Sequence, residues 1–341
     1  MNLREGLGFK YLSPQEQQAY KVILRAFSLM VASFDCSQIN RSVDLMKVIN
    51  TVLGDNPSVI YFNKTQIQTE ESMLGKRIIL TGVHSKPQVG KMNIDLEIKA
   101  NQIISSLKAT SNDEYSLLIN LYDFLQKNIR YDKNEMQANS KGISISPVSH
   151  TAYGAIINRT AVCDGFSSAF VLLAQKLNYE CTLAIGHSAY SSTSFTDHAW
   201  NIIKIRDRFY HMDITWDTRK YNEFGEHSYD YFALNDEEIT TDRKWDKKTT
   251  PVCSHNDFSY YSRNGLYANN ADELNKIIKT HGNKQAKVFR IKLSRNIPLP
   301  NNVGEYLTQR IVNEAVKAVG RFQISHGWNE NTRCFFAKIL N

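Results

Sequence analysis

The sequence has few cysteines, no two of them at CxxC spacing, and no apolar run long enough to cross a membrane. Its five cysteines stand far apart, at positions 36, 163, 181, 253 and 334 of 341. Without a CxxC pair a structural zinc site is not indicated. An odd number of scattered cysteines also argues against a disulfide framework, so at least one thiol should be free.

The first residues of the sequence are not expected to act as a signal peptide. Residues 1–20 carry several charged side chains and no apolar stretch of the kind that a signal peptide needs. The most apolar window, residues 22–34, is shorter than a bilayer span and contains Arg25. We therefore expect no membrane span and a cytoplasmic location, or a secreted or cell-surface one if a leader has been removed.

Positive charge exceeds negative charge without being concentrated. Lysine and arginine number 41 against 34 acidic residues, a formal net charge of +7. The densest basic stretch, residues 243–248, is interrupted by Asp246, and we interpret it as solvated surface. A nucleic-acid groove would need basic side chains clustered on one element or a recognisable module. Nucleic acid is therefore not expected as a partner.

The pattern of apolar residues divides the chain into four parts. A capping box at Ser13 and apolar stripes predict helices over residues 14–34 and 43–53, in a helical N-terminal region 1–70. Short β-type runs predict strands at 59–62 and 77–80 and a strand-rich connecting segment 71–110. A capping box at Ser111 opens a core, 111–267. Residues 268–341 form a small α+β domain with a strand at 289–293, a helix at 307–319 ended by Gly320, and strands at 321–324 and 333–340.

Within the core, helical and strand patterns alternate. Residues 131–147 lack periodicity and are predicted to be a loop. Apolar positions at helical spacing predict a helix from Cys163 to about residue 177, followed by a strand at 181–186 and a polar loop at 188–196. Strands at 198–205 and 209–215, joined by a charged turn, are predicted to form an antiparallel hairpin.

Cys163 is the first candidate for chemistry, because it stands where the central helix begins. The thiolate is the nucleophilic form of cysteine, and the unpaired N–H groups and positive dipole end of a helix N-terminus favour it. Gly165, two residues on, allows close backbone approach to a substrate. A lone cysteine at a helix start is more often structural than reactive, so the assignment depends on its neighbours in space.

The predicted hairpin supplies those neighbours. His198 can accept the thiol proton, and Asp213 on the returning strand can bond the far ring nitrogen and set its tautomer. Each residue alone also has a structural interpretation, as a satisfied strand histidine or a cap. His211 and Asp213, with His187 or His198, could instead bind a metal. The order of a cysteine at a helix start, then histidine and aspartate on a hairpin, is what thiol catalysis requires.

Four segments that surround these residues resemble the transglutaminase-like (transglutaminase/protease homologue) superfamily, in particular its bacterial, Firmicute-type branch. The likeness covers roughly residues 115–267, and its segments are Ala152-Tyr153-Gly154-Ala155, residues 161–170 around Cys163, His198-Ala199-Trp200-Asn201, and residues 210–217 around Asp213. The resemblance implies an α+β, papain-like core with the cysteine on a central helix against a short antiparallel sheet. It also implies a triad in which Cys163 attacks an acyl carbonyl, His198 moves the proton and Asp213 orients His198.

The resemblance further implies a protein or peptide substrate and no metal or organic cofactor. No glutamine stands shortly before Cys163, where papain-like enzymes place an oxyanion donor, so we hypothesise that the Tyr153 hydroxyl serves with the Cys163 N–H. Tyr153 packing in the core is the alternative. Trp200 either lines the substrate groove or fills the core, and Asn201 and Asp217 are candidate partners of the triad residues.

Three functions are consistent with these residues. The first is hydrolysis of peptide or isopeptide amides through a thioester, because water alone completes that reaction. The second is protein-glutamine transamidation, which needs a groove for an amine. The third is a non-catalytic binding module, although such modules usually lose triad residues. The sequence indicates neither the substrate nor the oligomeric state.

Overall fold

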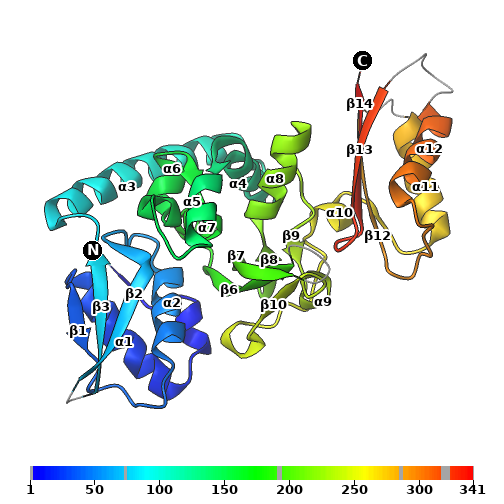
Figure 1. Ribbon diagram of the computed structural model, residues 1–341. Coiled ribbons are helices and arrows are strands. Elements are labelled where there is room, and N and C mark those ends of the chain that lie inside the picture. Colours follow the sequence, from blue (N-terminus) through cyan, green and yellow to red (C-terminus); the bar gives the residue numbers. More distant parts are fainter. Residues whose placement is uncertain (1–2, 73–74, 190–193, 284–286, 316–322, 341) are drawn as a thin grey trace.

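The computed structural model describes residues 3–72, 75–189, 194–283, 287–315 and 323–340. The N-terminal unit, the central core and the C-terminal unit follow one another across the molecule (Figure 1). The three largest hydrophobic clusters draw on residues 12–89, 96–258 and 261–337, and a smaller fourth one lies within residues 184–253. The α+β class predicted from the sequence is confirmed, while the domain boundaries at residues 70, 110 and 267 stay predictions.

Both helices predicted in the N-terminal unit are present, but the first, predicted over residues 14–34, ends at Ser28, and residues 33–35 form a strand instead. Helix α1 (Pro14–Ser28) begins at the predicted capping box, in which Ser13 and Glu16 each bond the other's backbone N–H. Helix α2 (Leu45–Asp55) is capped by Asp44. A short 3₁₀ helix, η1 (Gly8–Tyr11), precedes them.

A small antiparallel sheet completes this unit, in the order β1-β3-β2. Its strands are β1 (Ser33–Asp35), β2 (Phe62–Ser72) and β3 (Gly75–Gly82). The second predicted strand is confirmed as part of β3. The first was placed too early, because residues 59–61 are buried core that leads into β2.

The segment predicted to be strand-rich, residues 71–110, is mostly helical, so that prediction was wrong. Helix α3 (Lys86–Ala109) occupies its second half and begins at Ser85. Its buried positions, among them Leu96 and Ala100, are interspersed with Ile94 and Ile98, which are exposed. Apolar side chains on the exposed face of a helix obscure the 3.6-residue spacing of its buried apolar side chains, and the prediction of a helix depends on that spacing.

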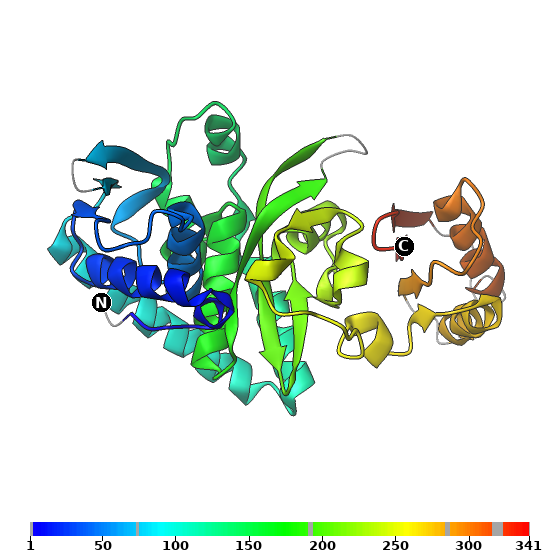
Figure 2. The same cartoon turned by 90° about the horizontal axis from the view of Figure 1, so that it is seen from below.

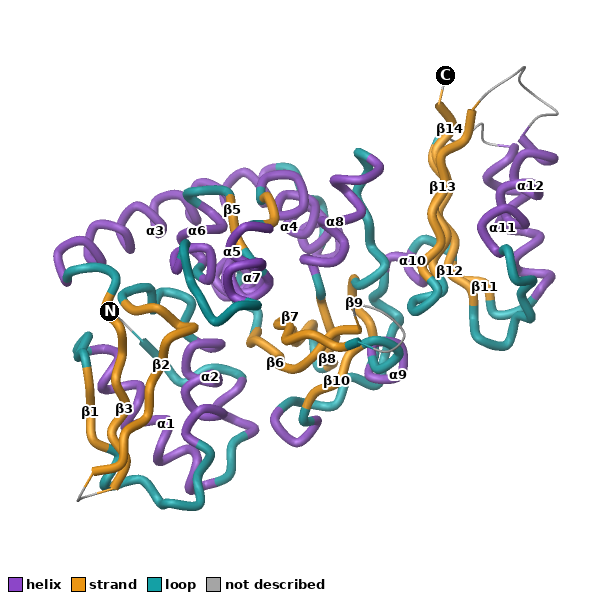
Figure 3. Tube along the Cα trace, viewed as in Figure 1, coloured by secondary structure: helices purple, strands orange, loops and turns teal. Residues whose placement is uncertain are grey.

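The central core packs helices over a five-stranded antiparallel sheet of order β10-β6-β7-β8-β9 (Figures 1 and 3). Helix α7 (Cys163–Lys176) contacts β6 and β7, as the predicted central helix should. The strands are β6 (Cys181–Ala189), β7 (Phe195–Ile205), β8 (Arg208–Met212), β9 (Phe232–Leu234) and β10 (Arg243–Trp245). The predicted hairpin is β7–β8, with Ile202 opposite His211.

Other core elements refine the predicted boundaries. Helix α4 (Glu114–Asn128) is capped by Asp113 and not by Ser111, because the reciprocal box is made with Ser116. The predicted loop 131–147 contains helix α5 (Lys133–Asn139). The remaining elements are β4 (Arg130–Tyr131), η2 (Pro147–His150), α6 (Ala152–Ile156), β5 (Thr160–Ala161), α8 (Ile214–Phe224), α9 (Asp236–Ile239), η3 (Lys247–Thr249) and α10 (Tyr260–Arg263).

The C-terminal unit pairs a four-stranded sheet, β11-β12-β14-β13, with two helices on one side (Figures 1 and 2). Its elements are β11 (Tyr267–Ala268), α11 (Ala271–Asn283), β12 (Val288–Leu293), α12 (Val303–Ala315), β13 (Gln323–Asn329) and β14 (Cys334–Leu340). The predicted strands at β12 and β14 are confirmed, and α11 was missed. The predicted end of the helix at 316–320 and the start of the strand at 321–322 lie outside the described residues.

None of the helices in the described part of the chain combines the length and the hydropathy that crossing a bilayer would require.

Candidate functional site

Cys163 occupies the first position of helix α7, where the sequence placed it. Val162 precedes the helix with extended backbone and makes no side-chain cap, while the N–H of Gly165 donates to Asp164 Oδ1 at 2.9 Å. The thiol is half-buried, and the backbone N–H of Ala199 on β7 bonds it. The start of α7 therefore faces the residue that follows His198.

The electrostatics of Cys163 differ from the sequence-based expectation. Burial raises the pKa of the Cys163 thiol to about 12, and the charges of Asp164 and Asp213 act in the same direction. The bonds from the Ala199 and Asp164 backbone lower it by less. Desolvation thus outweighs the helix N-terminus, and the thiol does not become a thiolate near neutral pH without a base beside it.

His198 and Asp213 are bonded to each other. Nε2 of His198 lies 2.7 Å from Oδ2 of Asp213, and both side chains are buried. Burial alone would raise the pKa of Asp213, but the charges of His198 and Arg243 outweigh it and lower that pKa to about 2. Because Asp213 uses Nε2, the other ring nitrogen, Nδ1, is the one left for a thiol proton.

The sequence analysis placed Asp213 in a strand, but in the structure Asp213 is the N-terminal cap of helix α8. Its Oδ1 accepts the backbone N–H of Trp216 at 3.4 Å, and its own N–H donates to the carbonyl of Tyr231 at 3.1 Å. Strand β8 therefore ends at Met212 instead of continuing to residue 215. The capping geometry fixes the carboxyl group beside His198.

Arg243 joins this pair, and sequence reasoning missed it. The basic stretch 243–248 was interpreted as solvated surface, yet the Arg243 side chain is fully buried. Its Nε and Nη2 lie 3.0 and 2.7 Å from Asp213 Oδ2. Within β10 (Arg243–Trp245) Arg243 is buried and Lys244 is exposed, a difference that the sequence alone does not indicate.

Trp200 is core and not groove lining, because none of its surface is exposed. Its ring stacks on His198, with centroids 5.9 Å apart, and its indole N–H donates to Nδ1 of His211 at 3.0 Å. Nε2 of His211 in turn lies 2.8 Å from Asp236. His211 therefore points away from Asp213 and toward a different carboxylate.

The hydrogen bonds of His211 argue against the metal site that the sequence analysis left open. His211 has Asp236 and Cys253 as neighbours, with ligand atoms within 4.8 Å of one another. An imidazole binds a metal through a nitrogen that carries no proton. Since Trp200 can only donate to Nδ1, the proton of neutral His211 sits on Nε2, the nitrogen that faces these neighbours. The residues do not fit a metal ligand set in this form.

Asn201 and Asp217 hold the surrounding elements together. Asn201 donates to the carbonyl of Ser167 at 3.0 Å and thereby ties β7 to α7. Asp217 is buried and accepts four bonds, from Tyr122 Oη, Ser228 Oγ and the N–H groups of Asp230 and Tyr231. Through Tyr231 it supports the backbone that binds Asp213.

Tyr153, the hypothesised oxyanion donor, packs against both the N-terminal and the central hydrophobic clusters. Its role stays a prediction. Tyr131 on β4 is a second tyrosine near the site, and its pKa is raised by burial and by the neighbouring charges of Cys163 and Asp164. No sequence pattern pointed to Tyr131, because it lies in the segment that was expected to be a loop.

A buried ionic cluster supports the start of α7. Nδ1 of His150 lies 2.8 Å from Asp164, and its Nε2 lies 3.1 Å from Glu135. Gly165 leaves no room for a side chain, because the carbonyl of Ser149 lies directly against it. Gly165 therefore admits the η2 backbone and not a substrate, contrary to the sequence-based interpretation.

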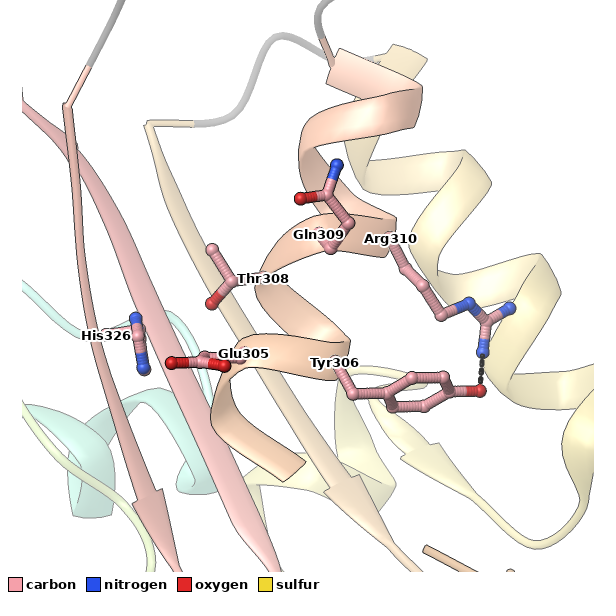
Figure 4. A pocket seen from close by; sticks show the side chains of 6 residues that line it. All are labelled: Glu305, Tyr306, Thr308, Gln309, Arg310 and His326. Atoms are coloured by element: carbon pink, nitrogen blue, oxygen red, sulfur yellow. Dashed lines mark hydrogen bonds between the residues drawn. The ribbon is translucent and has the colours of Figure 1, made fainter. Parts of the chain in front are cut away.

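A separate hollow of about 500 Å³ lies in the C-terminal unit (Figure 4). It is lined by residues of α12 and by His326 of β13, and Arg310 bonds Tyr306 at its rim. None of the predicted site residues lines it, so we assign it no part in the chemistry of Cys163.

Comparison with known proteins finds one family model that matches part of the chain. Residues 101–214 match the family model described as the transglutaminase-like superfamily, a range that includes Cys163, His198 and Asp213. That part of the chain is thus similar to the transglutaminase-like superfamily. No curated protein matches the chain.

Two solved structures are similar to part of the chain. One is a crystal structure of a TGase, with 12% identity, 44% coverage of both chains and a TM-score of 0.32. The other, a candidate cysteine protease from Cytophaga hutchinsonii, shows 14% identity, 44% coverage of this chain and 61% of its own, and a TM-score of 0.26. The chain thus spans less than two thirds of either structure. Neither bears on the Firmicute-type branch, which stays a prediction.

Proposed function

We propose that the protein is a cysteine-dependent acyl-transfer enzyme that hydrolyses peptide or isopeptide amides through a thioester. The observation that carries the proposal is the 2.7 Å bond between His198 Nε2 and buried Asp213, on the strand that also bonds Cys163 through the Ala199 N–H. This arrangement orients the imidazole of His198, and the residue next to it in the chain contacts the thiol, which supports His198 as the base.

In the proposed reaction, Nδ1 of His198 accepts the proton of Cys163 as sulfur attacks the acyl carbonyl. The N–H of Cys163, at the first position of α7, is available to the developing oxyanion. The imidazolium then gives its proton to the leaving amine, and a thioester remains on Cys163. Water, deprotonated by His198, hydrolyses the thioester and restores the thiol.

The ionised state of Asp213 supports this division of roles. With its pKa lowered to about 2, Asp213 stays a carboxylate throughout and stabilises the imidazolium that forms on His198. No described residue near Cys163 argues for an amine-binding groove, so water is the acceptor we favour over a lysine side chain.

The test is mass spectrometry of a peptide pool treated with the wild-type protein or with Cys163→Ala. New peptide termini or glutamine-to-glutamate conversion that require Cys163 are expected. Adding a labelled primary amine distinguishes the alternative, because transamidation would attach the amine to peptides in preference to hydrolysis. A pool left unchanged by both proteins would contradict the proposal and favour a binding module.

A further inference from the structure

Arg243 is a buried cation in direct contact with the proposed triad. Burying an unpaired guanidinium would be costly, so its partners are informative. The guanidinium lies between the rings of Trp216 and Tyr231, at 4.9 and 4.7 Å from their centroids. Its Nη1 lies 2.9 Å from Asp242 Oδ1. The side chain is therefore fixed on every side.

One oxygen of Asp213 serves two cations. Oδ2 accepts a hydrogen bond from Nε2 of His198 at 2.7 Å. It also accepts hydrogen bonds from Nε and Nη2 of Arg243, at 3.0 and 2.7 Å. A carboxylate that is shared with a permanent cation stabilises an imidazolium less than a carboxylate that serves the imidazole alone. Arg243 thus orients Asp213 and at the same time weakens the attraction of Asp213 for a proton on His198.

The C-terminal unit reaches Arg243 through Asp242. Oδ2 of Asp242 accepts the Tyr231 hydroxyl at 2.6 Å and the Asn331 side-chain amide at 3.2 Å. Asn331 stands in the turn between β13 and β14. A continuous series of contacts therefore runs Asn331–Asp242–Arg243–Asp213–His198, in which the Asp242–Arg243 side-chain link is an ion pair and the other links are hydrogen bonds.

We propose that Arg243 is a positioning residue of the triad, which aims Asp213 at His198 and keeps the proton on the Cys163 sulfur at rest, and that the Asn331 turn holds Arg243 through Asp242. The inference rests on the proposed function. Proton transfer from sulfur to His198 is then only partial before the acyl substrate binds, so the resting enzyme is alkylated and oxidised more slowly than it would be without Arg243.

Other charged or titratable groups face the same site and have to be held constant. Asp164 and Asp213 act on the Cys163 thiol, Tyr131 faces Cys163 from β4, and Lys64 and His150 face Asp164. The test therefore changes one residue at a time and compares two pH values in the same protein.

The readout is the ratio of the iodoacetamide labelling rate constants of Cys163 at pH 7 and pH 10. With a pKa of about 12 the thiol is only partly ionised at pH 10, but direct ionisation there is about a thousandfold greater than at pH 7 and does not need His198. The rate at pH 10 therefore reports access and direct ionisation, and the ratio reports proton transfer to His198. Arg243→Gln should raise the ratio about tenfold, the effect of about one pKa unit from a neighbouring charge. Arg243→Lys keeps the charge and should stay within about twofold of wild type. Asp242→Asn removes the second carboxylate that pairs with Arg243. The charge of Arg243 then acts on Asp213 alone, and the ratio should fall.

Arg208→Gln is the matched control, because Arg208 makes an exposed ion pair with Asp257 and should leave the ratio unchanged. If Arg243→Gln lowers the melting temperature but keeps the wild-type ratio, Arg243 is structural only and the inference is overturned. If Arg243→Gln does not fold, the Asp242→Asn variant tests the inference instead. An unchanged labelling ratio in Asp242→Asn would also overturn the inference. A wild-type ratio that His198→Ala does not alter would instead remove the proposed function itself.

Discussion

The indole N–H of Trp200 donates to Nδ1 of His211 over 3.0 Å, and this bond determines where His211 carries its proton. An indole N–H cannot accept, so Nδ1 must be the acceptor and the proton of the neutral ring lies on Nε2, which faces Asp236 at 2.8 Å. Trp200 stacks on His198 on its other side. A histidine that the sequence left open as a metal ligand therefore serves to hold the ring behind the proposed base.

Zinc should not stabilise the protein through His211, Asp236 and Cys253. The Cys163→Ser protein, which lacks the partly exposed thiol, is the form to use, and its melting temperature should change by less than about 1 °C when Zn²⁺ is added. A rise of several degrees that Cys253→Ala abolishes would show that His211 releases its Nε2 proton to a metal, and would contradict the tautomer assigned here.

Protonation of His211 should destabilise the fold. Burial lowers the pKa of His211 in spite of the opposing charge of Asp236, so the unfolded chain binds the proton more tightly than the folded one. Stability contributed by neutral His211 is complete above the unfolded pKa, near 6.5, and is lost as the pH falls below it. His211→Gln, whose amide can both accept from Trp200 and donate to Asp236, should lose less thermal stability than wild type between pH 7 and pH 5. Parallel melting curves of the two proteins would contradict this.

Asn201 should matter for both stability and reactivity, because its bond to the Ser167 carbonyl ties β7 to α7. Asn201→Ala leaves a buried carbonyl without this donor, and we expect a loss of about 1–2 kcal/mol in urea unfolding. The pH 7 labelling rate of Cys163 should fall as well, since the strand that carries His198 is less firmly fixed. Asn134→Ala, at an exposed position on α5, is the control and should change neither quantity. If Asn201→Ala destabilises the protein but leaves the labelling rate of Cys163 unchanged, the Asn201–Ser167 hydrogen bond does not align His198 with Cys163.

His150 should stabilise the protein at low pH more than at high pH. Burial alone would lower its pKa, but the charges and bonds of Asp164 and Glu135 outweigh it and raise the pKa. The stabilisation is then fully present below the unfolded pKa, near 6.5, and is lost as the pH rises through the folded pKa. His150→Gln should cost about 2 kcal/mol at pH 6 and less at pH 9, measured by urea unfolding at both pH values. An equal cost at both would show that the ionic form of His150 is not the stabilising one.

The parts of the site that follow from local sequence were predictable, and those that follow from long-range burial were not. The helix from Cys163 and the hairpin that carries His198 have clear periodicity. The pairing of His198 with Asp213 follows from that hairpin, although the cap at Asp213 does not. Arg243 could not be recognised, because a basic residue at a strand start next to Lys244 looks solvated until the sheet order places β10 beside β6. Helix α3 was missed for a related reason, since its exposed isoleucines conceal the buried stripe.

The most direct test of the account is the pH dependence of iodoacetamide labelling at Cys163 in wild type, His198→Ala and His198→Gln. The other four cysteines are at most 4% exposed, so the reagent should report on Cys163. Burial and the charges of Asp164 and Asp213 raise the pKa of this thiol to about 12, so we attribute fast labelling at pH 7 to His198. We predict that wild type reacts at pH 7 at least about tenfold faster than both variants, and that His187→Ala, at an exposed position on β6, reacts like wild type. Equal rates at pH 7 in wild type and both His198 variants would contradict the triad.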